Sequence, residues 1–151
     1  MKKTTLCYIK KDNRILLLHR IRKLNDPNEG KWIGIGGHFE SGETPEQCLL
    51  REVREETNLT LTSYHYIGII TFESDTYDTE EMHLFTADAF EGEVDYNCDE
   101  GELAWMDIEQ VSSLPMWEGD REFLPYVLEE PSEFIRMTLR YEGDNLVEVI
   151  R

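Results

Sequence analysis

The sequence predicts an α/β (α+β) fold in which helices pack on a mixed β-sheet. Segments with strand patterns alternate along the chain with segments that carry helix start signals. The apolar run Leu16-Leu17-Leu18 is typical of a strand that is buried on both faces of a sheet. The chain has 151 residues, of which 40% are hydrophobic, so we expect one domain over residues 1–151 with a single core.

The individual strands follow from short apolar or alternating runs that are bounded by turn residues. We expect strands at 4–9, 15–19, 63–72, 82–90 and 103–107, and a C-terminal hairpin of 134–141 and 146–150. Polar, turn-forming composition predicts loops at 20–29, which includes Arg22 and Lys23 as solvated residues, at 73–81 and at 116–120. We expect a short helix that is capped by Asp107 and a longer helix near 121–128.

The clearest helix signal follows a glycine-rich loop at 34–37, where the backbone can approach other groups closely. Thr44 and Gln47 fit a capping box, and Pro45 suits the first helical position. Asn58 can end the helix, because asparagine tolerates the left-handed conformation better than most residues.

Three glutamates share one side of this helix. At about 100° per residue, Glu55 and Glu56 lie roughly 60° and 40° to either side of Glu52. Carboxylates that crowd in this way repel one another, and a hard divalent cation among them would remove the repulsion. The alternative is a solvated acidic face on an acidic protein.

The net charge limits the partners. The chain carries 32 acidic and 15 basic residues, for a formal charge of −17. This balance argues against broad binding to a nucleic-acid polymer or an acidic membrane. A small phosphate substrate stays possible, because a bound metal and a few local basic residues can reverse the field within one cleft.

Cysteine usage and hydropathy indicate the compartment. Cys7, Cys48 and Cys98 are far apart and odd in number, which is typical of free thiols in a reducing environment. The first apolar run ends at Lys10 and is too short for a signal peptide, and no segment approaches a membrane span. We therefore expect a cytoplasmic protein.

The stretch from residue 37 to residue 59 resembles the Nudix box, in which a glycine, a glutamate and an Arg-Glu-x-x-Glu-Glu unit recur at fixed spacing. The matching positions are Gly37, Glu43, Arg51, Glu52, Val53, Glu55, Glu56 and Leu59, and Asn58 stands where the family has glycine. The resemblance implies the Nudix α/β/α sandwich. It also implies a hydrolase that cleaves a nucleoside diphosphate linked to another group, with Mg²⁺ as the cofactor and Mn²⁺ as an alternative.

The same resemblance implies roles for the acidic residues. Glu52, Glu55 and Glu56 would bind the metal together with the backbone of Gly37, while Glu43 and Arg51 would pair to brace the loop. A later loop often supplies a further carboxylate, and Glu100 is the candidate here. Whether Glu56 or Glu100 is the catalytic base stays open, as does whether Glu40 is an outer carboxylate or only a loop charge.

Beyond the box, the chain resembles the oxidised-purine nucleoside triphosphatase branch of MutT-like Nudix hydrolases at Trp32, Met116-Trp117, Asp120 and Pro125. This resemblance implies that Trp117 stacks on a purine, that Asp120 reads its edge and that Arg20 faces the phosphates. Trp32 is either a base-stacking platform or a core aromatic residue. Ile33 and Gly119 depart from the pattern. That branch has an asparagine at the position of Ile33 and an acid at the position of Gly119, and both read the base.

The sequence therefore predicts a Mg²⁺-dependent hydrolase that converts a purine nucleoside triphosphate, with 8-oxo-dGTP as the candidate, to the monophosphate and pyrophosphate. A nucleotide sugar, ADP-ribose or a dinucleoside polyphosphate is the alternative substrate. A non-catalytic nucleotide sensor on the same fold is the alternative function. We expect a monomer or a homodimer.

Overall fold

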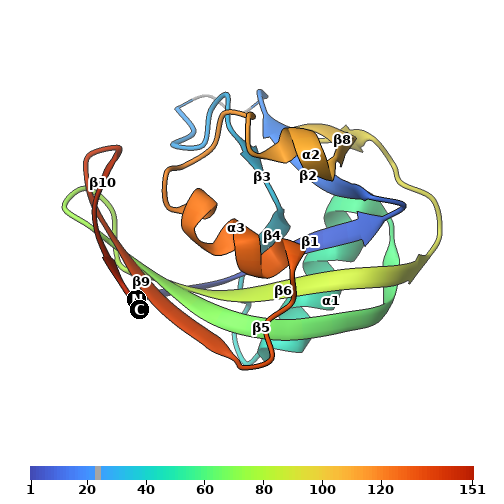
Figure 1. Ribbon diagram of the computed structural model, residues 1–151. Helices are drawn as coiled ribbons and strands as arrows, with labels where there is room; N and C mark the ends of the chain where they lie inside the picture. The colour runs from blue at the N-terminus through green and yellow to red at the C-terminus, as the bar shows by residue number, and fades with distance from the viewer. Residues whose placement is uncertain (23–24) are drawn as a thin grey trace.

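The computed structural model describes residues 1–22 and 25–151, so the expectation for Lys23 lies outside the described residues. The described strands form a mixed sheet in the order β10-β9-β5-β6-β1-β2-β8-β7, in which β3 also pairs with β2 and β4 with β1 (Figure 1). No described helix is both long and apolar enough to cross a bilayer.

The strands and helices follow one another along the chain. The strands are β1 (Lys2–Lys11), β2 (Arg14–Arg20), β3 (Trp32–Ile33), β4 (Ile35–His38), β5 (Thr60–Ser74), β6 (Glu80–Glu91), β7 (Asn97–Cys98), β8 (Gly101–Asp107), β9 (Ile135–Glu142) and β10 (Asn145–Ile150). The helices are α1 (Pro45–Thr57), α2 (Ile108–Val111) and α3 (Asp120–Leu128).

Two parallel pairs make the sheet mixed: β1 runs parallel to β6, and β5 runs parallel to β9. The strand β1 changes partner along its length. Its end at Lys11 pairs with β2, whereas its earlier half, from Thr4 to Cys7, pairs with β4. This change of partner brings the glycine-rich strand β4 into the sheet next to α1.

Both faces of the central strands are buried. In β2, Leu16 and Leu18 belong to the core cluster that contains Leu49 of α1, whereas Leu17 belongs to the cluster that contains Phe123 of α3. These five side chains are at most 1% exposed, and each stabilises the fold by about 1.5–3 kcal/mol relative to an exposed side chain. The helices therefore cover opposite faces of the sheet, as Figure 1 shows, and the expected α/β/α sandwich is confirmed.

Several local expectations need correction. The strands β5 and β6 extend beyond the expected 63–72 and 82–90, so the loop between them shrinks from 73–81 to 75–79. The residues 35–38 form β4, which hydrogen-bonds to β1, rather than remaining a loop. Asp107 makes no side-chain cap to α2. It accepts a hydrogen bond from Arg14 Nε at 3.0 Å instead, and this tertiary partner replaces the local one.

Candidate functional site

Helix α1 begins and ends as its sequence predicts. Gln47 N donates to Thr44 Oγ1 at 3.2 Å and Thr44 N donates to Gln47 Oε1 at 2.9 Å, which completes the capping box. Asn58 adopts the left-handed conformation at φ 68° and donates its N–H to Arg54 O. Both ends of the helix are thus fixed by local chemistry, and the register of its acidic side chains is fixed with them.

Arg51 binds most of the carboxylates around the start of α1. Its Nε and Nη2 donate to the two oxygens of Glu43 at 2.7 and 2.9 Å, which confirms the expected pair. Its Nη1 lies 2.8 Å from Glu52 Oε1 and 3.2 Å from Glu55 Oε2, and Glu40 lies 3.5 Å from its Nε. These hydrogen bonds lower the pKa of Glu43 to about 2 and raise the pKa of Arg51 further.

Glu56 lies in a different environment from its two neighbours. Among the described residues, its Oε2 is the one buried side-chain atom that has no hydrogen-bond partner. Burial is the main cause that raises its pKa to about 9, and the nearby charges of Glu100 and Glu52 raise it further. A carboxyl group in this position holds its proton at neutral pH unless a cation compensates the charge.

Gly37 lies against Glu52. A Cβ atom built on Gly37 would lie 2.5 Å from Glu52 Oε2, so a side chain there would displace the Glu52 carboxylate. Burial also raises the pKa of Glu52, against the opposing effect of Arg51. The backbone of Gly37 on strand β4 is therefore in close contact with the carboxylate of Glu52 on helix α1.

Arg20 is already paired. Its Nε donates to Asp26 Oδ2 at 2.8 Å, and its Nη1 lies 3.2 Å from Glu100 Oε2. Arg20 is 9% exposed and Asp26 is 7% exposed, so their ion pair is shielded from solvent. The sequence singled out Arg20 and Glu100 separately, but it did not indicate Asp26, which pairs with Arg20 from the loop that follows β2.

The described residues do not form a ready-made metal cage: no three Asp, Glu, His or Cys side chains among them are arranged to hold an ion as they stand. The reason is that Arg51 engages Glu52 and Glu55, while Arg20 engages Glu100. The donor set itself fits a hard divalent cation, because it consists of carboxylate oxygens and includes the unpartnered Oε2 of Glu56.

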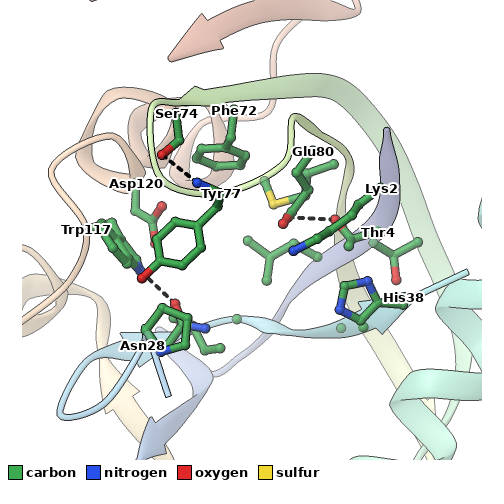
Figure 2. A pocket seen from close by; sticks show the side chains of 18 of the residues that line it. Lys2, Thr4, Asn28, His38, Phe72, Ser74, Tyr77, Glu80, Trp117 and Asp120 are labelled. Carbon is green, nitrogen blue, oxygen red and sulfur yellow. Dashed lines mark hydrogen bonds between the residues drawn. The ribbon is translucent and has the colours of Figure 1, made fainter. Parts of the chain in front are cut away.

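A cavity of about 270 Å³ opens beside this acidic group. Arg20, Gly36 and Gly37 line one part of it. Trp117 and Asp120, which Figure 2 labels, line another. Glu52, Glu55, Glu56 and Glu100 are not among its lining residues. The cavity thus joins the glycines in front of α1 to the aromatic and acidic residues that precede and begin α3.

The polar groups around Trp117 are well defined. Its indole Nε1 donates to Asn28 Oδ1 at 2.6 Å, and Lys31 Nζ lies 4.4 Å from the centre of its ring. Asp120 is 6% exposed, and burial together with the charge of Glu80 raises its pKa to about 7. A carboxyl group with this pKa can either donate or accept a hydrogen bond near neutral pH.

The structure shows what surrounds Gly119 and Ile33, the two positions at which the chain departs from the family pattern. Gly119 N donates to the Tyr141 hydroxyl at 2.7 Å, and a Cβ on Gly119 would lie 2.5 Å from that oxygen. Tyr141, which comes from β9, therefore occupies the space that an acid at position 119 would need. Ile33 lines the cavity, and so do Asn28 and Tyr77, neither of which the sequence indicated.

Trp32 is placed elsewhere. Its ring stacks on His19, with 4.4 Å between the ring centres and 3° between the planes, and its backbone N–H donates to Pro115 O. It is partly buried against the core cluster on the α3 side and does not line the cavity. The structure therefore brings Trp117, Asp120 and Arg20 to the cavity, but not Trp32.

The comparisons with known proteins agree on one family. Residues 2–127 match the family model described as the NUDIX domain. The chain is similar to an oxidized purine nucleoside triphosphate hydrolase from Danio rerio, with 38% identity over 128 residues that cover 83% of this chain and 79% of that protein. It is also similar to an uncharacterized Nudix hydrolase, YvcI, from Bacillus subtilis, with 32% identity over 85% of this chain and 80% of that protein.

A solved structure resembles the whole fold. A MutT protein from Bacillus halodurans superposes with a TM-score of 0.88 at 28% sequence identity, covering 99% of this chain and 97% of that one. The likeness therefore extends beyond the acidic helix to the C-terminal hairpin.

Proposed function

Since this chain belongs to the Nudix family of hydrolases, we propose that it is a Mg²⁺-dependent pyrophosphohydrolase that converts a purine nucleoside triphosphate to the monophosphate and pyrophosphate. Nudix hydrolases act on small nucleotide substrates and generally use a divalent metal.

The observation that carries the proposal is the cavity that runs from the glycines of β4 to Trp117 and Asp120. A nucleotide likewise has two different ends: its phosphates are polyanionic, and its base is flat and aromatic. We assign its phosphates to the end near Gly37, beside α1, and its base to the end near Trp117, whose face can stack on a purine. Asp120 is then the polar group that reads the edge of the base.

The metal ligands in this proposal are Glu52, Glu55, Glu56, Glu100 and the backbone of Gly37. When bound there, Mg²⁺, or Mn²⁺ as the alternative, would offset the charge of the phosphates and lower the pKa of a bound water. Before that, Glu56 keeps its proton, because its pKa is raised to about 9. Glu56 and Glu100 are the two candidates for the base that accepts the proton of the attacking water.

Arg51 and Arg20 have different parts. Arg51 holds Glu43 through two parallel hydrogen bonds, a geometry that fixes the loop before α1. Arg20 lines the cavity, and Asp26 and Glu100 hold its guanidinium in place. The donors of Arg20 that are left can contact a phosphate.

For the base, we propose a purine and test 8-oxo-dGTP first. The relative from Danio rerio is named for oxidized purine nucleoside triphosphates. This chain keeps Trp117 and Asp120 at the positions that carry the resemblance. Ile33 and Gly119 replace polar residues of that pattern, so the preference among purines is expected to differ. The complete Arg51-Glu52-x-x-Glu55-Glu56 unit argues against a sensor, which has no need for a full set of metal ligands.

The test is a panel of nucleotides with Mg²⁺, scored for pyrophosphate and phosphate release. The panel contains 8-oxo-dGTP, the four ordinary nucleoside triphosphates, ADP-ribose, a nucleotide sugar and a dinucleoside polyphosphate. The expected result is pyrophosphate release that is fastest with a purine triphosphate and is abolished by a chelator. Faster cleavage of ADP-ribose or a nucleotide sugar would overturn the substrate proposal, and nucleotide binding without any product would indicate a sensor.

A further inference from the structure

Asn28 lies in the wall of the cavity that we assign to the base. It is half-buried and lines the cavity together with Ile33, Trp117 and Asp120. Ile33 offers no polar side-chain atom to this wall, because its side chain is a hydrocarbon. The amide of Asn28, which comes from the loop between β2 and β3, lies beside Trp117, as Figure 2 shows.

The orientation of this amide is fixed by its partner. The indole nitrogen of Trp117 can only donate a hydrogen bond, so the atom of Asn28 that lies 2.6 Å from it must be the carbonyl oxygen. The hydrogen bond to Trp117 uses the oxygen alone, so the Nδ2 group is the part of the amide that is left for a ligand in the cavity that Asn28 lines. Asn28 therefore presents an NH₂ donor to the cavity and uses its acceptor on the protein.

The backbone around Asn28 is held in place as well. Its N–H donates to Asp26 Oδ1 at 3.1 Å, and its carbonyl accepts from Lys31 N at 2.9 Å. Asp26 is buried and is itself bound to Arg20 at 2.8 Å. The amide is thus arranged before a ligand arrives, which reduces the entropy lost on binding.

We infer that Asn28 is a specificity-determining residue that donates a hydrogen bond from Nδ2 to the 6-oxo group of a guanine-type base stacked on Trp117. An asparagine with both amide atoms available pairs well with adenine, which offers a donor and an acceptor side by side. Here the oxygen is committed to the indole, and the remaining donor suits guanine, whose O6 and N7 are both acceptors. This inference rests on the proposed function, because it takes the ligand to be a purine nucleotide.

The test exchanges donor and acceptor on both partners. Asn28→Asp keeps an acceptor for the Trp117 indole but presents an oxygen to the cavity in place of the NH₂ group. The matched ligands are dGMP and 2,6-diaminopurine deoxyribonucleoside monophosphate, in which an amino donor replaces the 6-oxo acceptor. Dissociation constants are measured by calorimetry in the presence of a chelator, and kcat/KM is measured for the corresponding triphosphates with Mg²⁺.

The wild-type protein is expected to prefer the 6-oxo base by about ten- to hundredfold, and Asn28→Asp is expected to reverse the preference. Asn13→Asp, in the turn between β1 and β2, adds the same charge away from the cavity and should leave the preference unchanged. The diaminopurine analogue can be compared on the wild-type protein even if Asn28→Asp does not fold.

Two results would overturn the inference: equal affinity of the wild-type protein for the two monophosphates, or an Asn28→Asp variant that weakens both equally. The second result is what a merely structural role would give. Failure of the proposed function has a different signature, because the triphosphates would then not be hydrolysed although the monophosphates still bind and still distinguish the variants.

Discussion

Replacing Glu56 by glutamine is expected to raise the stability of the metal-free protein while lowering its turnover by orders of magnitude. The folded-state pKa of Glu56 is about 9, against an ordinary value of 4.5. The native state therefore holds this proton more tightly than the unfolded state. The free energy of unfolding of the wild type should accordingly fall as the pH rises from 4.5 to 9, and the effect is absent in Glu56→Gln.

The magnitude follows from the width of that window. Between pH 4.5 and pH 7, at about 1.36 kcal/mol per pH unit, the variant gains at most about 3 kcal/mol over the wild type. Urea unfolding in a chelator at pH 5, 7 and 8.5, followed by tryptophan fluorescence, measures this difference. With Mg²⁺ and substrate, turnover of Glu56→Gln should drop by about 10²- to 10⁴-fold, because the variant loses a metal ligand or a base.

A matched control is Glu46→Gln, which changes an exposed glutamate in the first turn of the same helix. It should alter neither the pH dependence of stability nor turnover. The reasoning would be refuted if Glu56→Gln were less stable than the wild type at pH 8.5 without metal. Turnover at the wild-type level would remove Glu56 from the mechanism.

Three further changes test neighbouring contacts. Gly37→Ala places a methyl group 2.5 Å from Glu52 Oε2, so the Glu52 carboxylate must move. We expect a loss of turnover with a smaller effect on stability, measured by kinetics and urea unfolding. Gly119→Asp should lower the melting temperature and not increase activity on 8-oxo-dGTP, because Tyr141 fills the space; higher activity would contradict this account. The pKa of Glu43 is lowered to about 2, so its pair contributes stability above pH 4.5 that is lost as the pH falls through 2. Glu43→Gln should flatten the acid limb of the stability curve, and an unchanged limb would argue against the pair.

Local signals predicted the acidic helix well. The caps at Thr44 and Asn58 and the pair of Glu43 with Arg51 depend on residues at most eight apart, and the structure has all of them. The two-sided burial of Leu16-Leu17-Leu18 also followed from composition alone. Where the physics is local, the sequence was sufficient.

The remaining features depend on contacts between distant parts of the chain. Trp117 and Asn28 are 89 residues apart, and no spacing rule relates them. Aspartate is a residue type that favours helix caps, but the carboxylate of Asp107 accepts a hydrogen bond from Arg14, which is 93 residues away. The grouping of Glu52 and Glu55 was expected around a cation, whereas in the structure Arg51 lies between them.

The contacts of Arg51 affect how the chain folds without a metal ion. A row of carboxylates in a chain of net charge −17 would ordinarily oppose folding until an ion arrived. Arg51 serves as a built-in counterion, because one guanidinium touches Glu43, Glu52 and Glu55 at once. These three carboxylates are therefore compensated within the folded chain before any divalent ion binds.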